Sequence, residues 1–143
     1  MPKGIRILCY DPAADELIRE FRRAYERVKP EPLTGIDKIG NIRIGGKRYI
    51  RPEQKYQNDV KTILTRDNEI WAVTSTADES KGVLIDVFDD RGIYQDRFYL
   101  KLPRSALHYI GYPRYCALDG DFLWIVEQDE DDICTIKKYR LVI

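Results

Sequence analysis

Two segments of this chain share one layout, and that repeat constrains the fold more than any other feature. Residues 62–75 (TILTRDNEIWAVTS) and 115–128 (YCALDGDFLWIVEQ) each place an apolar run before a tight polar turn and an alternating, tryptophan-bearing strand. The tryptophans, Trp71 and Trp124, lie 53 positions apart. Self-similarity at such a period is typical of small supersecondary units stacked on one another. The repeat therefore predicts a stack of similar small sheets.

The composition narrows the classes of partner. Lys and Arg total 24 and Asp and Glu total 24, so the formal net charge is zero. This balance gives no electrostatic reason to expect a nucleic acid or an acidic membrane as partner. Apolar residues make up 43% of the 143 residues, and ten residues are Tyr. These values indicate a folded chain of single-domain size with a preference for strands.

Short strands fill the second half of the chain. Strands are expected at residues 60–64, 69–75, 83–88 and 93–100, joined by turns rich in Asp, Asn and Gly. This is the content of one antiparallel four-stranded sheet. After an expected loop at residues 103–113, the order begins again at residues 115–118, 122–128 and 133–142.

The N-terminal segment allows two interpretations. Residues 5–10 (IRILCY) predict a strand that ends at Asp11-Pro12. Beyond it, apolar side chains recur at helical spacing, and Asp11-Pro12 would suit a helix start, so periodicity alone predicts a helix over residues 12–27. However, Leu17, Arg19 and Phe21 also alternate, and the repeat favours a strand. The sequence leaves both possibilities open.

Residues 29–55 form the least regular region. Pro30, Pro32 and Pro52, with four glycines between them, indicate an irregular insertion. Residues 41–50 (NIRIGGKRYI) predict a hairpin that turns at Gly45-Gly46. Its basic cluster, with an interleaved tyrosine, is either a solvated hairpin or a contact for a phosphate or an acidic partner. The cluster consists of Arg43, Lys47, Arg48, Tyr49 and Arg51.

Two adjacent motifs carry a family resemblance. Residues 67–75 (DNEIWAVTS) followed by residues 86–94 (DVFDDRGIY) resemble a blade of the six-bladed β-propellers of the NHL/TolB-like group, many of which have no known function. Residues 7–28 resemble the outer strands of a preceding blade, and Tyr139-Arg140-Leu141 resembles a terminal strand. The resemblance covers most of the chain except residues 29–55. It implies an all-β fold of antiparallel, four-stranded propeller-like blades.

The resemblance also implies that the propeller is partial. Such propellers close with about six blades, whereas this chain provides two to two and a half. We expect one domain over residues 1–143, with outer strands at 1–28, an insertion at 29–55, a complete blade at 56–102 and a partial last blade at 103–143. Open sheet edges favour self-association or pairing with a missing N-terminal propeller portion.

The preferred function is a non-catalytic scaffold that binds a protein or a ligand, without a cofactor. The alternative is part of a metal-dependent lactonase or lyase, as in some related propellers. That alternative requires several inward-facing carboxylates or histidines, and His108 is the only histidine. The sequence has no G-x-S-x-G elbow, no H-E-x-x-H motif and no P-loop, so no catalytic or metal-binding residue is assigned.

Several residues have both a structural and a functional interpretation. His108 is a possible proton shuttle or ligand contact, but a loop histidine without an obvious partner favours neither. Trp71 and Trp124 are expected to pack between adjacent sheets rather than to stack on a ligand.

The run Asp129–Asp132 lacks calcium-loop spacing and predicts a solvated turn. Asp67, Asp89 and Asp119 end strands and are expected to bond nearby backbone N–H groups.

The remaining features bear on the compartment, which the sequence leaves open. The odd cysteine count (Cys9, Cys116 and Cys134) does not suggest a disulfide framework, and each cysteine is expected to be a small buried side chain. No apolar run approaches the ~20 residues of a membrane span. The first residues lead into a strand without an apolar signal core.

Overall fold

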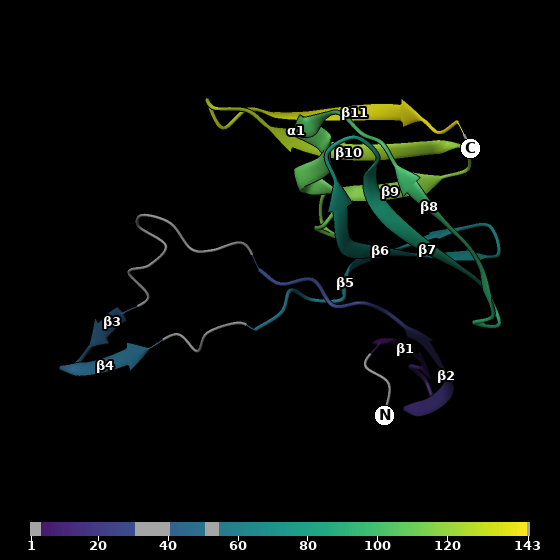
Figure 1. The fold of residues 1–143 in the computed structure, drawn as a ribbon, viewed down its shortest axis with the longest axis horizontal. Coiled ribbons are helices and arrows are strands. Elements are labelled where there is room, and N and C mark those ends of the chain that lie inside the picture. Colours follow the sequence, from purple (N-terminus) through teal and green to yellow (C-terminus); the bar gives the residue numbers. More distant parts are fainter. Residues whose placement is uncertain (1–3, 31–40, 51–54, 143) are drawn as a thin grey trace.

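Antiparallel strands and one short helix make up the fold (Figure 1). The structure is a computed structural model that describes residues 4–30, 41–50 and 55–142. The strands are β1 (Gly4–Asp11), β2 (Glu16–Ala24), β3 (Asn41–Ile44), β4 (Lys47–Ile50), β5 (Val60–Arg66), β6 (Glu69–Asp78), β7 (Gly82–Asp89), β8 (Tyr94–Leu100), β9 (Cys116–Asp119), β10 (Phe122–Gln128) and β11 (Cys134–Arg140), and the helix is α1 (Arg104–Tyr109). The predicted all-β, antiparallel class is confirmed.

The strands form separate sheets of two, four and three strands. The four-stranded sheet has the order β5-β6-β7-β8, the three-stranded sheet has the order β11-β10-β9, and the two hairpins are β1-β2 and β3-β4. Each predicted strand of the second half is present within a few residues of its expected bounds. Among the described residues these sheets do not close into a barrel or a ring.

The four-stranded sheet lies in the middle of a stack, because its strand β7 is apolar on both faces. Along β7, Val83, Ile85 and Val87 point to one side, while Leu84 and Phe88 point to the other, and all five side chains are buried. A strand buried on both faces has a nearly continuous apolar sequence rather than an alternating one. The segment VLIDVF therefore requires that something cover each face of the sheet.

The three-stranded sheet and α1 cover one face. Leu123 and Ile125 of β10, with Ala106 of α1, pack in one cluster with Trp71 and Val73 of the central sheet. Trp71 is only 1% exposed. Its ring meets Phe98 edge-on at 5.0 Å between centroids. The predicted packing of Trp71 between neighbouring sheets is confirmed.

The β1-β2 hairpin covers the other face. Ile5, Ile7 and Phe21 of the hairpin pack against Ala72 of β6 and Phe88 of β7. In Figure 1 the hairpin lies on one side of the central sheet and the β9–β11 sheet lies on the opposite side. The β3-β4 hairpin, which the glycine pair predicted, lies apart from this stack.

The helical interpretation of residues 12–27 is wrong. Residues 16–24 form β2, which pairs antiparallel with β1. The competing alternation of Leu17, Arg19 and Phe21 prevailed, because a strand places Phe21 on the face that the central sheet buries. The tertiary contact therefore outweighs the local helical period.

Aspartate side chains stabilise the turns between strands. The Asp89 carboxylate accepts hydrogen bonds from the backbone N–H of Arg91 (3.0 Å) and Ile93 (2.8 Å) between β7 and β8. Asp129 does the same for the turn between β10 and β11. Both match the expected structural roles, since an aspartate oxygen satisfies turn amides that the sheet leaves unpaired. Asp67 has a positive φ of 48° in its turn.

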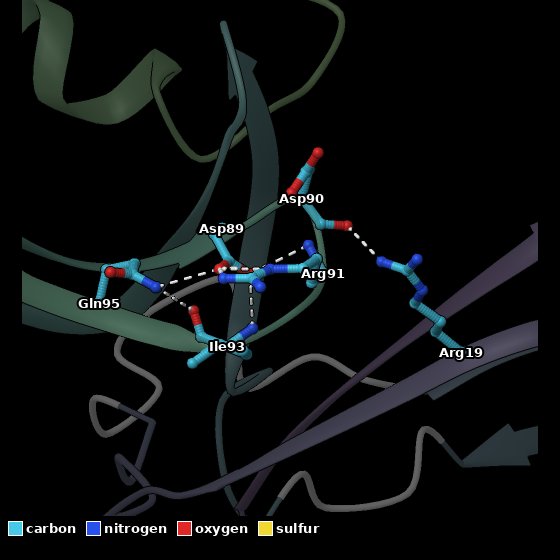
Figure 2. A network of polar contacts seen from close by, with 6 residues as sticks. All are labelled: Arg19, Asp89, Asp90, Arg91, Ile93 and Gln95. Atoms are coloured by element: carbon cyan, nitrogen blue, oxygen red, sulfur yellow. Dashed lines mark hydrogen bonds and ion pairs between the residues drawn. The ribbon is translucent and has the colours of Figure 1, made fainter.

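The β7-β8 turn also touches the N-terminal hairpin. Figure 2 shows the Arg19 guanidinium donating a hydrogen bond to the Asp90 carbonyl, at 2.9 Å. Gly92 has a φ of 82°, and a Cβ there would overlap the ring of Phe21. Glycine is required at this position for two reasons: the left-handed backbone and the close approach of Phe21.

Two other expectations are wrong. The loop expected at residues 103–113 contains a helix, α1, over residues 104–109. Cys9 and Cys134 are exposed rather than buried, and only Cys116 is partly buried. Burial raises the pKa of the Cys116 thiol to about 11, so this thiol is protonated at neutral pH and a poor nucleophile.

Replacing Gly92 with alanine should destabilise the protein by about 2–4 kcal/mol, from roughly 1 kcal/mol of backbone strain plus the overlap with Phe21. Urea unfolding measures the change. Gly120→Ala is the matched control, because Gly120 also has a positive φ (54°) but nothing lies near its added Cβ. The control should lose only about 1 kcal/mol. Equal losses in the two variants would contradict the proposed Gly92–Phe21 contact.

Candidate functional site

The single histidine lies on α1 beside a group of aromatic rings. The His108 ring centroid is 5.1 Å from that of Tyr109 and 5.3 Å from that of Tyr112. Tyr115 extends the group through contacts with both tyrosines. The Tyr109 hydroxyl is fixed by Gln128, whose carbonyl accepts from it at 3.0 Å and whose N–H donates to it at 3.1 Å. His108 is therefore exposed on an ordered aromatic surface.

Two β-bulges lie opposite α1 in the central sheet. In β5, Val60 pairs with Thr74 and Thr62 pairs with Val73, so Lys61 is an extra, unpaired residue. In β6, the pairing with β7 shifts between Val73 and Ala77. A bulge bends its strand and redirects side chains.

Side-chain hydroxyls of the β6 bulge form hydrogen bonds that hold its shape. Thr74 donates to the carbonyl of Leu84 at 2.9 Å, and Ser75 donates to the carbonyl of Asn58. The hydroxyls of Thr76 and Tyr25 lie 2.7 Å apart. The Thr-Ser pair of the family-like motif therefore holds the bulge rather than contacting a ligand.

A cavity of about 870 Å³ opens between the bulges and α1. Small-molecule sites commonly have volumes of roughly 300–1,000 Å³. Its apolar wall comes from the bulged strands, β7 and the helix segment, namely Val73, Ala77, Val83, Leu107 and Ile110. Its polar wall contains three basic side chains and further hydrogen-bonding groups, namely Lys61, Arg104, His108, Gln57, Asn58 and Tyr112. Of the candidates from the sequence, His108 lies in this cavity.

The other weak candidates lie elsewhere. Arg43 is on β3, while Arg48 and Tyr49 are on β4, and these strands pair as a hairpin. The side chains of these three residues are outside the described part of the structure, as is all of Arg51. Lys47 is exposed. The proposed phosphate or acidic partner of this cluster stays a prediction.

The residues that the structure describes contain no group of three or more His, Cys, Asp or Glu side chains suited to a metal ion. The acidic run Asp129–Asp132 is instead an exposed turn closed by its own backbone. Within the same residues, no helix has the length and apolar character needed to cross a membrane.

A buried carboxylate, Asp86, is the main polar group that the sequence interpretation missed. Asp86 lies on β7 with no exposed surface, and it accepts a hydrogen bond from Arg23 of β2 at 2.7 Å. The Arg97 guanidinium lies 3.7 Å away. Burial raises the Asp86 pKa, and the two arginines only partly offset this effect. A lone aspartate inside the apolar run VLIDVF is the signal that could have revealed it.

The Asp86–Arg23 pair connects the hairpin to the central sheet. The Arg23 guanidinium also stacks over the Tyr94 ring, 3.8 Å from its centroid. One carboxylate oxygen of Asp86, Oδ2, has no hydrogen-bond partner. Breaking such a pair is costly, because it leaves a charge in a medium that solvates it poorly.

The outer face of the β9–β11 sheet is open. Phe122, Trp124 and Val126 of β10 and Ile136 of β11 point away from the central sheet, opposite to the buried Leu123 and Ile125, as strand alternation and register require. The Lys138 ammonium lies over the Phe122 and Trp124 rings, 3.8 and 4.8 Å from their centroids. Among the residues that the structure describes, the expected inter-sheet packing of Trp124 is therefore absent. We call these four side chains the open face.

In comparisons with known proteins, no family model, no curated protein and no solved structure matches this chain. The resemblance to six-bladed propellers therefore stays a prediction from the sequence.

Replacing Arg23 with glutamine should destabilise the protein by roughly 3 kcal/mol, because Asp86 then remains buried with Arg97, at 3.7 Å, as its remaining charged partner. Adding Asp86→Asn should recover part of that loss, so the double variant should be more stable than Arg23→Gln alone. Arg22→Gln is the control, since Arg22 pairs with Glu20 on the exposed side of the hairpin and should cost under about 1 kcal/mol. A double variant less stable than Arg23→Gln would contradict this account.

The raised pKa of Asp86 predicts a pH effect of unusual sign. The folded protein holds the Asp86 proton more tightly than the unfolded chain, so the contribution of this residue to stability rises as the pH falls through its folded pKa. The stability of the wild type relative to Asp86→Asn should therefore increase between neutral pH and the ordinary value near 3.8. Urea titrations of both proteins at several pH values measure the difference. A relative stability that falls with acidification would show that the pKa is lowered.

Proposed function

We propose that this chain is a non-catalytic scaffold of propeller-like blades that binds a second copy of itself through the open face. The observation that carries the proposal is the contrast between Trp71 and Trp124. These residues occupy equivalent places in the repeat, yet Trp71 is 1% exposed and Trp124 is 36% exposed. The neighbouring Ile136 is 67% exposed.

The internal repeat indicates what kind of surface fits the open face. Trp71 belongs to the second strand of its sheet and pairs with Leu64. Trp124 belongs to the second strand of its own sheet and pairs with Ala117. The Trp71 face is covered by the inner face of the next sheet. By analogy, the Trp124 face should accept another sheet of the same kind.

The N-terminal hairpin offers such a sheet. Its outer face carries Leu8, which is 38% exposed, beside the ion pairs of Glu20 with Arg6 and Arg22. The outer face of the hairpin points away from the central sheet, and the inner face of the β9–β11 sheet points toward it. Because the two lie on opposite sides of the central sheet, these two faces point in the same direction along the stack. The hairpin of one copy can therefore continue the stack of another, head to tail. A heterologous contact of this kind builds either a ring or an open filament.

The propeller-like blade is part of the proposal. The four-stranded antiparallel order β5-β6-β7-β8 supports this part of the proposal, because a propeller blade is a sheet of four strands. The three-stranded sheet corresponds to the first three of these strands. Head-to-tail association would then extend a partial propeller with further blades.

Sedimentation velocity over a range of concentrations tests this function. The wild type should associate, and Ile136→Lys should raise the dissociation constant at least tenfold, because a buried unpaired ammonium opposes the contact. Leu8→Lys should weaken association as well if the contact is head to tail. Ile44→Lys is the matched control, since Ile44 is similarly exposed (64%) but lies on the separate β3-β4 hairpin.

A wild type that stays monomeric at high concentration would refute self-association. Weakening by Ile136→Lys but not by Leu8→Lys would replace the head-to-tail arrangement with a symmetric contact between two open faces. Circular dichroism of each variant checks that the fold is retained.

A further inference from the structure

We propose that the cavity between the two bulges and α1 binds a small organic carboxylate with a compact apolar body. This site is separate from the open face and is formed within a single chain. Three independent observations support it: the positive charge of its wall, the β-bulge that places Lys61 in it, and an unsatisfied hydroxyl beside it.

The wall of the cavity is positively charged and has no compensating carboxylate. Lys61 and Arg104 line it, and no Asp or Glu is among its lining residues. Neither Lys61 nor Arg104 forms an ion pair with any residue that the structure describes. Cations gathered in a concave, partly apolar site raise the local concentration of anions. An arginine fork and an ammonium suit the two oxygens of a carboxylate.

The bulges that shape the cavity have no counterpart in the β9–β11 sheet. Lys61 faces the cavity as the extra residue of the β5 bulge, and the β6 bulge separates Val73 from Ala77. In the β9–β11 sheet, the equivalent strand β10 pairs with both neighbours without any shift of register. By the 53-residue repeat, β9 and β10 do not extend to the positions equivalent to Lys61 and Ala77, so the bulges belong to the longer strands β5 and β6. Bulges occur preferentially beside functional sites, where they redirect a side chain.

A buried hydroxyl next to the cavity lacks a partner. Thr62 is 3% exposed, and its Oγ1 makes no hydrogen bond. Thr62 pairs with Val73, so their side chains point to the same face of the sheet, and Val73 lines the cavity. An unsatisfied buried hydroxyl costs about 1–3 kcal/mol. Thr62 does not itself line the cavity, so a water molecule that bridges its hydroxyl to the ligand would remove this cost.

The most enclosed part of the cavity wall determines which kind of ligand body fits there. Val73, Val83 and Ile110 are almost completely buried, so the cavity is apolar where it is most enclosed. The basic side chains lie at exposed positions nearer to solvent. This arrangement favours an anion whose charge is at one end. An inorganic phosphate would use the basic groups but leave the apolar wall empty.

Titration of the full-length protein with matched probes tests the proposal. Hexanoate and benzoate supply the carboxylate with two apolar bodies, hexanamide and benzamide are their neutral counterparts, and inorganic phosphate supplies charge without a body. Backbone amide chemical shifts from NMR report both the affinity and the location. We expect each carboxylate to bind at least tenfold more tightly than its amide, with shifts at the two bulges and α1. Added salt should weaken binding.

Three variants locate the site. Combining Lys61→Gln with Arg104→Gln should reduce carboxylate affinity at least tenfold, and Ala77→Phe should abolish it by filling the cavity. Arg114→Gln is the control. Arg114 is exposed and follows the cavity-lining residue Pro113 in the sequence, but it does not line the cavity itself. Lys61, Ala77 and Arg104 are all exposed, so thermal unfolding should show that the variants keep the fold.

Several results would overturn the proposal. These are no binding of any probe, equal affinity for a carboxylate and its amide, or unchanged affinity in the Lys61/Arg104 variant. Phosphate binding as tight as that of hexanoate and benzoate would also overturn it, since it would define an anion site that ignores the apolar wall. Because the cavity belongs to one chain, the titration can be repeated on Ile136→Lys, which separates this proposal from self-association.

Discussion

The structure depends on one constraint: the central sheet must be covered on both faces. Strand β7 is apolar in both directions, and its six central side chains, Val83 to Phe88, are all buried. The hairpin supplies one cover and the β9–β11 sheet with α1 supplies the other. A four-stranded sheet of this sequence could not remain in water alone, because its apolar surface on either side would be exposed.

Polar groups in this core occur where elements meet. Asp86 faces the hairpin and holds Arg23, and the Arg19 guanidinium reaches the β7-β8 turn. On the other face, Glu127 is buried beside α1. Burial raises the Glu127 pKa, but bonds from Lys137, Tyr139 and Ser105 outweigh this effect and lower the pKa overall. The two carboxylates therefore differ: Glu127 is fully bonded, whereas Asp86 keeps one oxygen without a partner. Asp86 joins the hairpin to the central sheet, whereas Glu127 joins α1 to the β9–β11 sheet within one cover.

The strands could be predicted from the sequence, because alternation, turn residues and the repeat all indicated the same elements. The local patterns were less decisive at residues 12–27, where Phe21 satisfies both a helical and an alternating spacing and only its packing on Phe88 selects the strand. Helix α1 was missed because six residues after a proline give almost no periodic signal. The buried state expected for Cys9 and Cys134 failed because an apolar neighbourhood in sequence does not show which face of a strand is covered.

The cavity could not be predicted beyond His108. Its wall combines residues 57–61, 73–83 and 104–113, and it depends on two register shifts that leave no clear mark in the sequence. Likewise, the exposure of Trp124 does not follow from its local pattern, which is almost the same as that of Trp71. The difference arises because Trp71 faces the β9–β11 sheet, whereas Trp124 faces no other sheet that the structure describes.

No β-ladder joins the hairpin to the central sheet, so the hairpin can detach while the strands of the sheet stay paired. Among the described residues, β1 and β2 pair only with each other, so side chains alone hold them against Ala72 and Phe88. Detaching the hairpin breaks no sheet hydrogen bond, whereas separating β6 from β7 breaks a ladder at the centre of the molecule. Backbone amides in the central strands should therefore exchange with solvent only through global unfolding, while the N-terminal hairpin forms a separate, less protected unit.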